Sequence, residues 1–170
     1  MSRRVVVTGI GVISPVGIGK DNFWTSLMAG KSGIGPITHF DPSEYSTRIA
    51  GQVNDFVPED FLDKKEAKRM DRNTQFSIAA SKLAIEDAGI DLEKVDKRRA
   101  GVIVATGIGG VSTMHDQYET LFAKGPNRIS PFFVPMMIAN MASGQTSIQF
   151  GFQGPCLCIV TACTGGTNAI

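Results

Sequence analysis

The chain has 170 residues, of which 42% are hydrophobic and 19% are charged, and its formal net charge is +1. These values are typical of a folded globular domain with a sizeable core. The balanced charge gives no support to nucleic acid or an anionic membrane surface as a partner, and no stretch approaches the ~18 apolar residues of a membrane span.

The N-terminal stretch superficially resembles a secretory leader, because Arg3 and Arg4 precede an apolar run. Gly9, Gly11 and Pro15 interrupt that run, and no small-residue cleavage site follows. We therefore interpret residues 5–7 as the first buried strand of the core.

The remaining elements follow in chain order from apolar periodicity and from glycine and proline positions. We expect helices at residues 21–29, 64–70, 73–88, 111–124, 132–141 and 142–150, a short strand near 49–53, and buried strands at 102–106 and 157–161. This alternation indicates an α/β fold with a mainly parallel sheet and right-handed crossovers.

Two similar glycine turns, at residues 8–11 and 106–109, each follow a Val-rich run. Such turns can hold a phosphate at a helix N-terminus, but the complete G-x-G-x-x-G pattern is missing: Ser14 and Ser112 stand where the third glycine would be. The pattern therefore favours tight strand-to-helix turns over a nucleotide site.

The three cysteines, Cys156, Cys158 and Cys163, are crowded into eight residues. An odd, clustered set is a poor disulfide framework and is typical of a reducing compartment, so we expect the cytoplasm. The C-x-C-x4-C spacing has no histidine nearby, and we expect no metal. Cys156 and Cys158 are interpreted as inert residues of a strand.

Cys163 differs, because it stands between a strand that ends at Thr161 and a helix that starts near Gly165. A sulfur on such a sharp turn resembles a nucleophile elbow, and the free N–H groups of a helix N-terminus favour a thiolate and can bind an oxyanion. A buried, unreactive cysteine is the alternative, and the spacing alone does not separate the two.

Other polar residues carry weaker signals. Lys64, Lys65, Lys68 and Arg69 form one positive helical stripe, which is either a solvated face or a docking patch for an acidic partner. The two histidines, at positions 39 and 115, join no catalytic pattern and are interpreted as structural.

The whole chain resembles the N-terminal part of the β-ketoacyl-[acyl-carrier-protein] synthases, closest to type II, the condensing enzymes of bacterial fatty-acid synthesis. The resemblance is carried by RRVVVTGIGVISPVG, KSGI, KRMDR, ATGIGG, ISPFFVP and GPCLCIVTACTGGTNAI. It implies a thiolase-like layered α/β/α fold with helices on both faces of the sheet, of which residues 1–170 are an incomplete N-terminal half that ends just after the nucleophile.

The resemblance also implies roles for single residues. Cys163 matches the nucleophile, which carries the acyl chain during a decarboxylating Claisen condensation with malonyl-acyl-carrier protein. Ile108 and Phe133 match acyl-pocket positions, and Phe133 reaches into the pocket of the second subunit of a homodimer. Four residues match the surface that docks the acidic acyl carrier protein: Lys65, Lys68, Arg69 and Arg128. No resident cofactor is implied, because phosphopantetheine arrives on the carrier.

Two departures accompany the resemblance. The cysteine is followed by TGGTN where ACATGTN or ACTSG is usual, and the family's catalytic histidines and lysine belong to motifs that this chain lacks. We therefore expect the chain alone not to condense acyl groups, and to be poorly stable with an apolar sheet edge and face exposed. A non-catalytic dimerising subunit is the alternative function.

Overall fold

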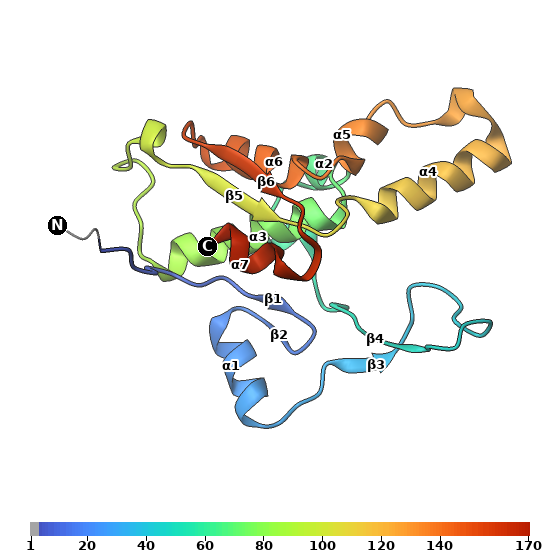
Figure 1. Cartoon of the computed structure of the whole chain (residues 1–170), viewed down its shortest axis with the longest axis horizontal. Helices are drawn as coiled ribbons and strands as arrows, with labels where there is room; N and C mark the ends of the chain where they lie inside the picture. Colours follow the sequence, from blue (N-terminus) through green and yellow to red (C-terminus); the bar gives the residue numbers. More distant parts are fainter. Residues whose placement is uncertain (1–3) are drawn as a thin grey trace.

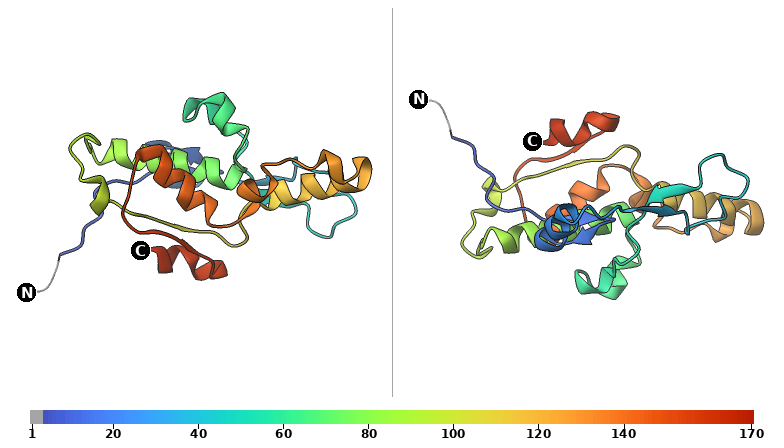
Figure 2. Two further views of the ribbon diagram at one scale, coloured as in Figure 1. Left: turned by 90° about the horizontal axis from the view of Figure 1, so that it is seen from above. Right: turned by 90° about the horizontal axis from the view of Figure 1, so that it is seen from below.

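The computed structural model describes residues 4–170 and is built around two parallel strands with helices on both faces (Figures 1 and 2). Strand β5 (Val102–Ala105) pairs with β6 (Cys156–Ile159), so that Ala105 lies opposite Ile159. Helix α6 (Met141–Phe150) covers one face of the pair, and the short helix α7 (Gly165–Ala169) covers the other. The predicted α/β class is confirmed.

The most extensive contact between two elements in the described part of the chain joins α6 to α3 (Arg72–Asp87). Ala142 of α6 is completely buried, and its backbone oxygen lies 3.5 Å from the Ser77 hydroxyl of α3, so the two helices approach closely. The polar residues in this interface are satisfied, because the hydroxyls of Ser77 and Thr146 are 2.8 Å apart and share a hydrogen bond. This interface supports the strand pair.

Of the other elements, the helices and the strand near residue 50 lie near their predicted positions with ends shifted by a few residues, whereas the short strands before residue 40 and the 3-10 turns were not predicted. The other elements are β1 (Ile13–Ser14), β2 (Gly17–Ile18), α1 (Lys20–Met28), β3 (Ile34–Pro36), β4 (Ile49–Gly51), η1 (Pro58–Asp60), α2 (Lys64–Ala67), η2 (Lys97–Arg99), α4 (Val111–Lys124), η3 (Pro126–Arg128), α5 (Phe133–Met137) and η4 (Ala162–Thr164). β1 pairs with β2, and β3 with β4, both antiparallel. Across residues 4–170, no helix combines the length and apolarity needed to span a membrane.

The first predicted strand is wrong for this structure. Residues 5–7 form no strand, and Val5 is 93% exposed. The physical reason is that no strand within the described part of the chain lies beside them, so their backbone groups have no ladder to join. Of the two arginines that precede the apolar run, Arg3 lies outside the described residues, which begin at Arg4.

The first glycine turn also differs from the prediction, because residues 8–11 lead to β1 and not into a helix. Gly9 and Gly11 lie directly on α3, where a Cβ would collide with the backbone oxygens of Ala84 and Ala80. These glycines permit a close approach between the N-terminal segment and α3.

The last strand forms where expected, but it is only partly covered. Leu157 is 52% exposed and Cys156 is exposed, whereas Cys158 is half-buried. Because β6 pairs with a single neighbour among the described strands, its outer edge and part of one face remain open. The predicted exposure of an apolar edge is confirmed, and the predicted burial of this strand is wrong.

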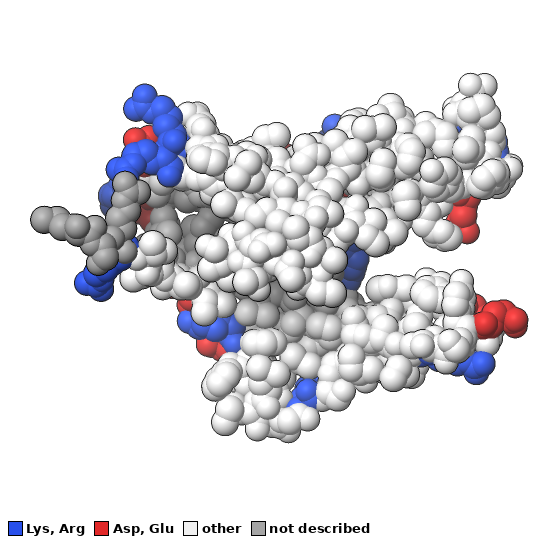
Figure 3. All heavy atoms as spheres, in the orientation of Figure 1, with Lys and Arg blue, Asp and Glu red and all other residues white. Residues whose placement is uncertain are grey.

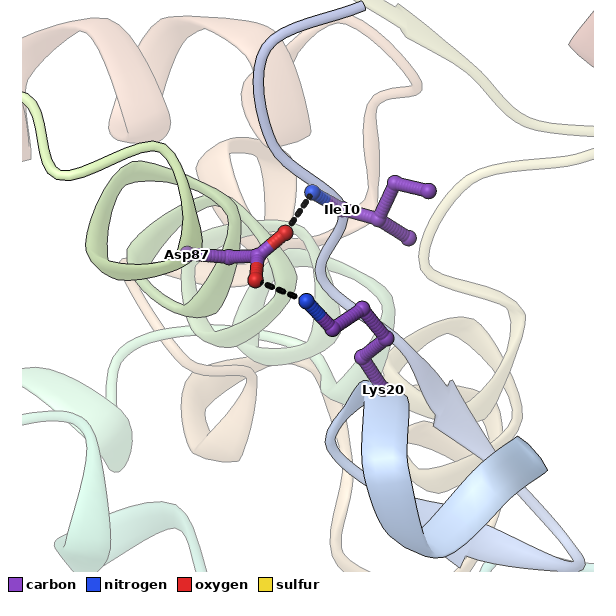
Figure 4. A network of polar contacts seen from close by, with 3 residues as sticks. All are labelled: Ile10, Lys20 and Asp87. Atoms are coloured by element: carbon purple, nitrogen blue, oxygen red, sulfur yellow. Dashed lines mark hydrogen bonds and ion pairs between the residues drawn. The ribbon is translucent and has the colours of Figure 1, made fainter. Parts of the chain in front are cut away.

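A polar network fastens the N-terminal segment and α1 to the end of α3 (Figure 4). One carboxylate oxygen of Asp87 accepts a hydrogen bond from the Ile10 N–H at 2.9 Å, and the other pairs with the Lys20 ammonium. The Lys20 contact, followed by the Ile10 N–H, lowers the pKa of Asp87, and Asp87 raises the pKa of Lys20. One exposed carboxylate thus joins three segments of the chain.

We expect Asp87→Asn to lower the thermal unfolding midpoint near neutral pH. The difference in midpoint between the variant and the wild type should become smaller as the solution is acidified. A carboxyl whose pKa is lower in the folded than in the unfolded chain stabilises above its unfolded pKa, and that contribution is lost as the pH falls through its folded pKa. Thermal melts between about pH 7 and about pH 3 measure this, with Asp55→Asn as an exposed control. An Asp87→Asn gap that stays constant with pH would contradict the assignment.

Candidate active site

The predicted turn at Cys163 is present, and the thiol is exposed. After β6 the chain forms one 3-10 turn, η4, which contains Cys163, and α7 begins directly after this turn. Ala162, next to the cysteine, has φ 48°, the only positive φ at a non-glycine residue in the described chain. A left-handed backbone at alanine costs free energy and is typical of functional turns, so the sharp bend under the sulfur is a specific feature of this fold.

Three polar side chains brace this turn. The Thr164 hydroxyl donates to the Thr161 carbonyl oxygen at 2.8 Å, and the Asn168 amide donates to the Thr161 hydroxyl at 2.9 Å. The same amide lies 3.4 Å from the Thr164 hydroxyl. The sequence analysis missed this set, although the T-x-x-T-x-x-x-N spacing places the three side chains on one side of a turn followed by a helix.

A close contact holds α7 on the strand pair. Gly165 is buried, and a Cβ at this position would lie 3.0 Å from the Cβ of Ala105 in β5. That distance is shorter than most carbon contacts, so a side chain at position 165 would push the turn after Cys163 and β5 slightly apart.

Ile108 lies at the same edge of the sheet as Cys163. The Thr106 N–H donates to the Ile159 carbonyl oxygen at 3.1 Å, so the two parallel strands end side by side and their following turns leave together. Ile108 is 69% exposed in the first of these turns. Charged side chains are sparse over β6 and α7 on the face drawn in Figure 3.

Phe133 lies farther along, as the first residue of α5, and is half-buried. The other end of α5 contacts the turn that carries Ile108, because the Gly110 N–H donates to the Met137 carbonyl oxygen at 2.9 Å. The structure therefore joins the turn with Ile108 and the Phe133 helix through a backbone hydrogen bond.

The candidate docking residues are all exposed. Lys65 is on α2, whose first turn is capped by the Asp63 carboxylate, and Lys68 and Arg69 follow directly. The Arg69 guanidinium lies 4.9 Å from the ring centre of Phe132, beside Phe133 in the chain. Arg128 belongs to a separate element, η3.

The remaining candidates do not join the site. The thiol of Cys158 is half-buried, and burial, followed by the neighbouring Cys156, raises its pKa. His115 is exposed on α4 and lies 3.5 Å from a carboxylate oxygen of Glu119, which agrees with a structural or surface role.

The family model described as Beta-ketoacyl synthase, N-terminal domain, matches residues 2–170, and the chain belongs to this family. Among curated relatives, 3-oxoacyl-[acyl-carrier-protein] synthase 2 of Synechocystis is 52% identical over 99% of this chain and 40% of its own length. The Staphylococcus aureus protein of the same name is 46% identical over 99% of this chain and 41% of its own length. The chain thus spans about 40% of these relatives.

Solved structures agree. The ishigamide ketosynthase/chain length factor matches with a TM-score of 0.86 and 30% identity, over 94% of this chain and 40% of that one. A beta-ketoacyl synthase from Burkholderia phymatum matches with a TM-score of 0.78 and 23% identity, over 98% of this chain and 41% of that one. A ketosynthase solved with a type II PKS acyl-carrier protein and bound to the hexaketide matches with a TM-score of 0.73 and 20% identity, over 99% of this chain and 44% of that one. The thiolase-like ketosynthase fold is confirmed.

The three thiols should differ in their rates of alkylation. Because the thiolate is the nucleophile, the raised pKa of Cys158 should make it the slowest of the three toward iodoacetamide, behind exposed Cys163 and Cys156. Peptide mass spectrometry over a time course near pH 8 measures the order, and the difference should disappear in denaturant. Equal native rates at positions 158 and 163 would refute this ranking.

Proposed function

We propose that the whole protein is a β-ketoacyl-[acyl-carrier-protein] synthase that elongates fatty acids, and that this chain supplies its nucleophile and one side of its acyl site. The observation that carries the proposal is the exposed Cys163 thiol on a braced, strained turn, at the same sheet edge as Ile108. The match to relatives named 3-oxoacyl-[acyl-carrier-protein] synthase 2 supports the reaction class.

In the first step the Cys163 thiolate attacks the carbonyl carbon of an acyl thioester on the carrier protein. The new carbon–sulfur bond replaces the bond to the phosphopantetheine sulfur, which leaves as a thiolate and takes up a proton. Covalent capture divides a difficult reaction into two easier ones. The braced turn keeps the sulfur fixed while charge develops on the carbonyl oxygen.

In the second step malonyl-carrier protein loses carbon dioxide, and the electron pair of the broken bond attacks the Cys163 thioester. A carbon–carbon bond forms and the cysteine sulfur leaves as a thiolate. By resemblance, two histidines and a lysine assist this step, and the present sequence does not contain their motifs. We therefore assign acyl capture to this chain, and condensation only to the whole protein.

The acyl carrier protein is the proposed partner. Lys65, Lys68, Arg69 and Arg128 are exposed cations, and a carrier protein rich in acidic residues would complement them. The proposal needs no resident cofactor, because phosphopantetheine enters with the carrier. It also includes a second copy of the chain, toward which α5 would present Phe133, and a reducing cytoplasm that suits three free cysteines.

Intact-mass analysis tests acyl capture directly. After incubation with acyl-carrier protein, the folded chain should gain the mass of one acyl group, and Cys163→Ala should gain none. Cys156→Ala is the matched control, because it removes another exposed thiol from the same strand-and-turn segment. An adduct on Cys163→Ala, or no adduct on folded wild type, would remove the support for the proposal and favour a non-catalytic subunit.

Charge reversal tests the docking surface. Lys65→Glu, Lys68→Glu and Arg69→Glu should each slow Cys163 acylation by roughly two- to fivefold at low salt, because an exposed ion pair contributes little. The effect should shrink as salt screens the charges. Lys124→Glu, at the far end of α4, is the control. Equal loss in all four variants would show that net charge, and not this surface, governs the rate.

A further inference from the structure

Asp71 has an unusual environment for a carboxylate. Its side chain belongs to a residue that is only 5% exposed, and none of the ion pairs among the described residues includes it. One oxygen accepts from the Asn73 N–H at 3.0 Å. The other accepts from the Thr113 N–H at 3.0 Å and from the Thr113 hydroxyl at 2.7 Å. Both carboxyl oxygens of this buried residue are therefore satisfied by hydrogen-bond donors.

These donors belong to the N-terminal turns of two different helices. Asp71 is the N-cap of α3, and Thr113 is the third residue of α4. The two residues are 42 positions apart in the chain. Free N–H groups and the positive end of the helix dipole favour a carboxylate at both places. A purely local cap would need only the Asn73 contact, so the bonds to Thr113 have a separate consequence.

That consequence concerns the turn before α4, which carries Ile108. A Cβ on Gly110 would lie 3.0 Å from the Asp71 carboxyl carbon, so the carboxylate is packed against the end of the turn. On its other side the turn is bonded to α5 through the Gly110 N–H and the Met137 oxygen at 2.9 Å. Within the turn, the Gly109 N–H donates to the Thr106 hydroxyl at 3.1 Å. The turn that carries Ile108 is thus held between Asp71 on one side and α5 on the other.

We propose that Asp71 is a positioning residue, which acts through Thr113 to set the orientation of the turn bearing Ile108 and thereby the acceptance of long acyl chains. The inference rests on the proposed acyl capture at Cys163. Asp71 lies two residues after Arg69, so the same short segment that presents the docking cations also fixes one wall of the acyl site.

Three substitutions separate this role from simple helix capping. Asp71→Asn keeps an oxygen for the α3 cap, since asparagine caps helices as well as aspartate, but its amide group cannot accept the bonds of Thr113. Thr113→Val removes the hydroxyl with little change of shape, and Thr113→Ser keeps it. Asp96→Asn changes an exposed cap on η2 and is the control.

The readout is the ratio of Cys163 acylation rates with long-chain and short-chain acyl-carrier proteins. We expect the ratio to fall about fivefold in Asp71→Asn and Thr113→Val, the size of effect that one buried hydrogen bond supports. Thr113→Ser and Asp96→Asn should keep the wild-type ratio. Iodoacetamide should alkylate Cys163 at the wild-type rate in every variant, because that small reagent does not use the acyl site.

Hydrogen exchange gives a second readout that does not depend on acylation. Peptides covering residues 106–114 should exchange faster in Asp71→Asn and Thr113→Val than in wild type or Asp96→Asn. If Asp71→Asn and Thr113→Val lower the melting temperature but leave the rate ratio unchanged, the proposal is overturned and Asp71 is only a structural helix cap.

Two further outcomes separate this proposal from the proposed function. If the wild type takes no acyl group from any donor, the proposed function fails. If exchange at residues 106–110 is unchanged in the variants, the positioning role alone is overturned.

Discussion

The close packing of α3 on α6 is the interaction on which the rest of the structure depends. Ala142 and Thr146 of α6 are buried beside Ser77 of α3, and this contact holds the two helices together. β5 and β6 lie on α6, and the turns that leave these strands carry Ile108 and Cys163. A two-stranded sheet has little stability alone, so the positions of both turns follow from the helix pair beneath it.

Parallel pairing then explains why the candidate active site contains residues so far apart in the sequence. Parallel strands need a long crossover, and here the crossover comprises α4, α5 and α6. It returns the chain to the opposite end of the sheet, from which β6 runs back to the edge where the turn with Ile108 begins, and it places α5 against that turn. Gly165 and Ala162 complete the arrangement: glycine permits the contact with β5, and the left-handed alanine bends the chain under the sulfur. Asp71 holds the turn that carries Ile108 on the side away from α5.

Much of this could be predicted from the sequence, because the signals were local. A Val-rich run with a glycine stop located β5, an apolar run located β6, apolar spacing located α3 and α4, and the strand–cysteine–glycine order located the turn at Cys163. The failures involved partners distant in the chain. Val5 needs a neighbouring strand that no local pattern reveals, and the bond between Asp71 and Thr113 depends on how two helices meet. The resemblance supplied the roles of Ile108 and Phe133, whose hydrophobicity alone predicts only core packing.

Hydrogen exchange in an overpacked variant tests the central dependence most directly. Ala142→Leu inserts a larger side chain into α6 at a completely buried position beside Ser77 of α3, where overpacking costs about 1–3 kcal/mol. The exposed substitution Ala123→Leu on α4 is the control. We expect the amides of β5, β6 and the turn at residues 161–165 to lose protection together with those of α3 and α6. Undiminished protection of the two strands and this turn, with α3 and α6 loosened, would contradict the account.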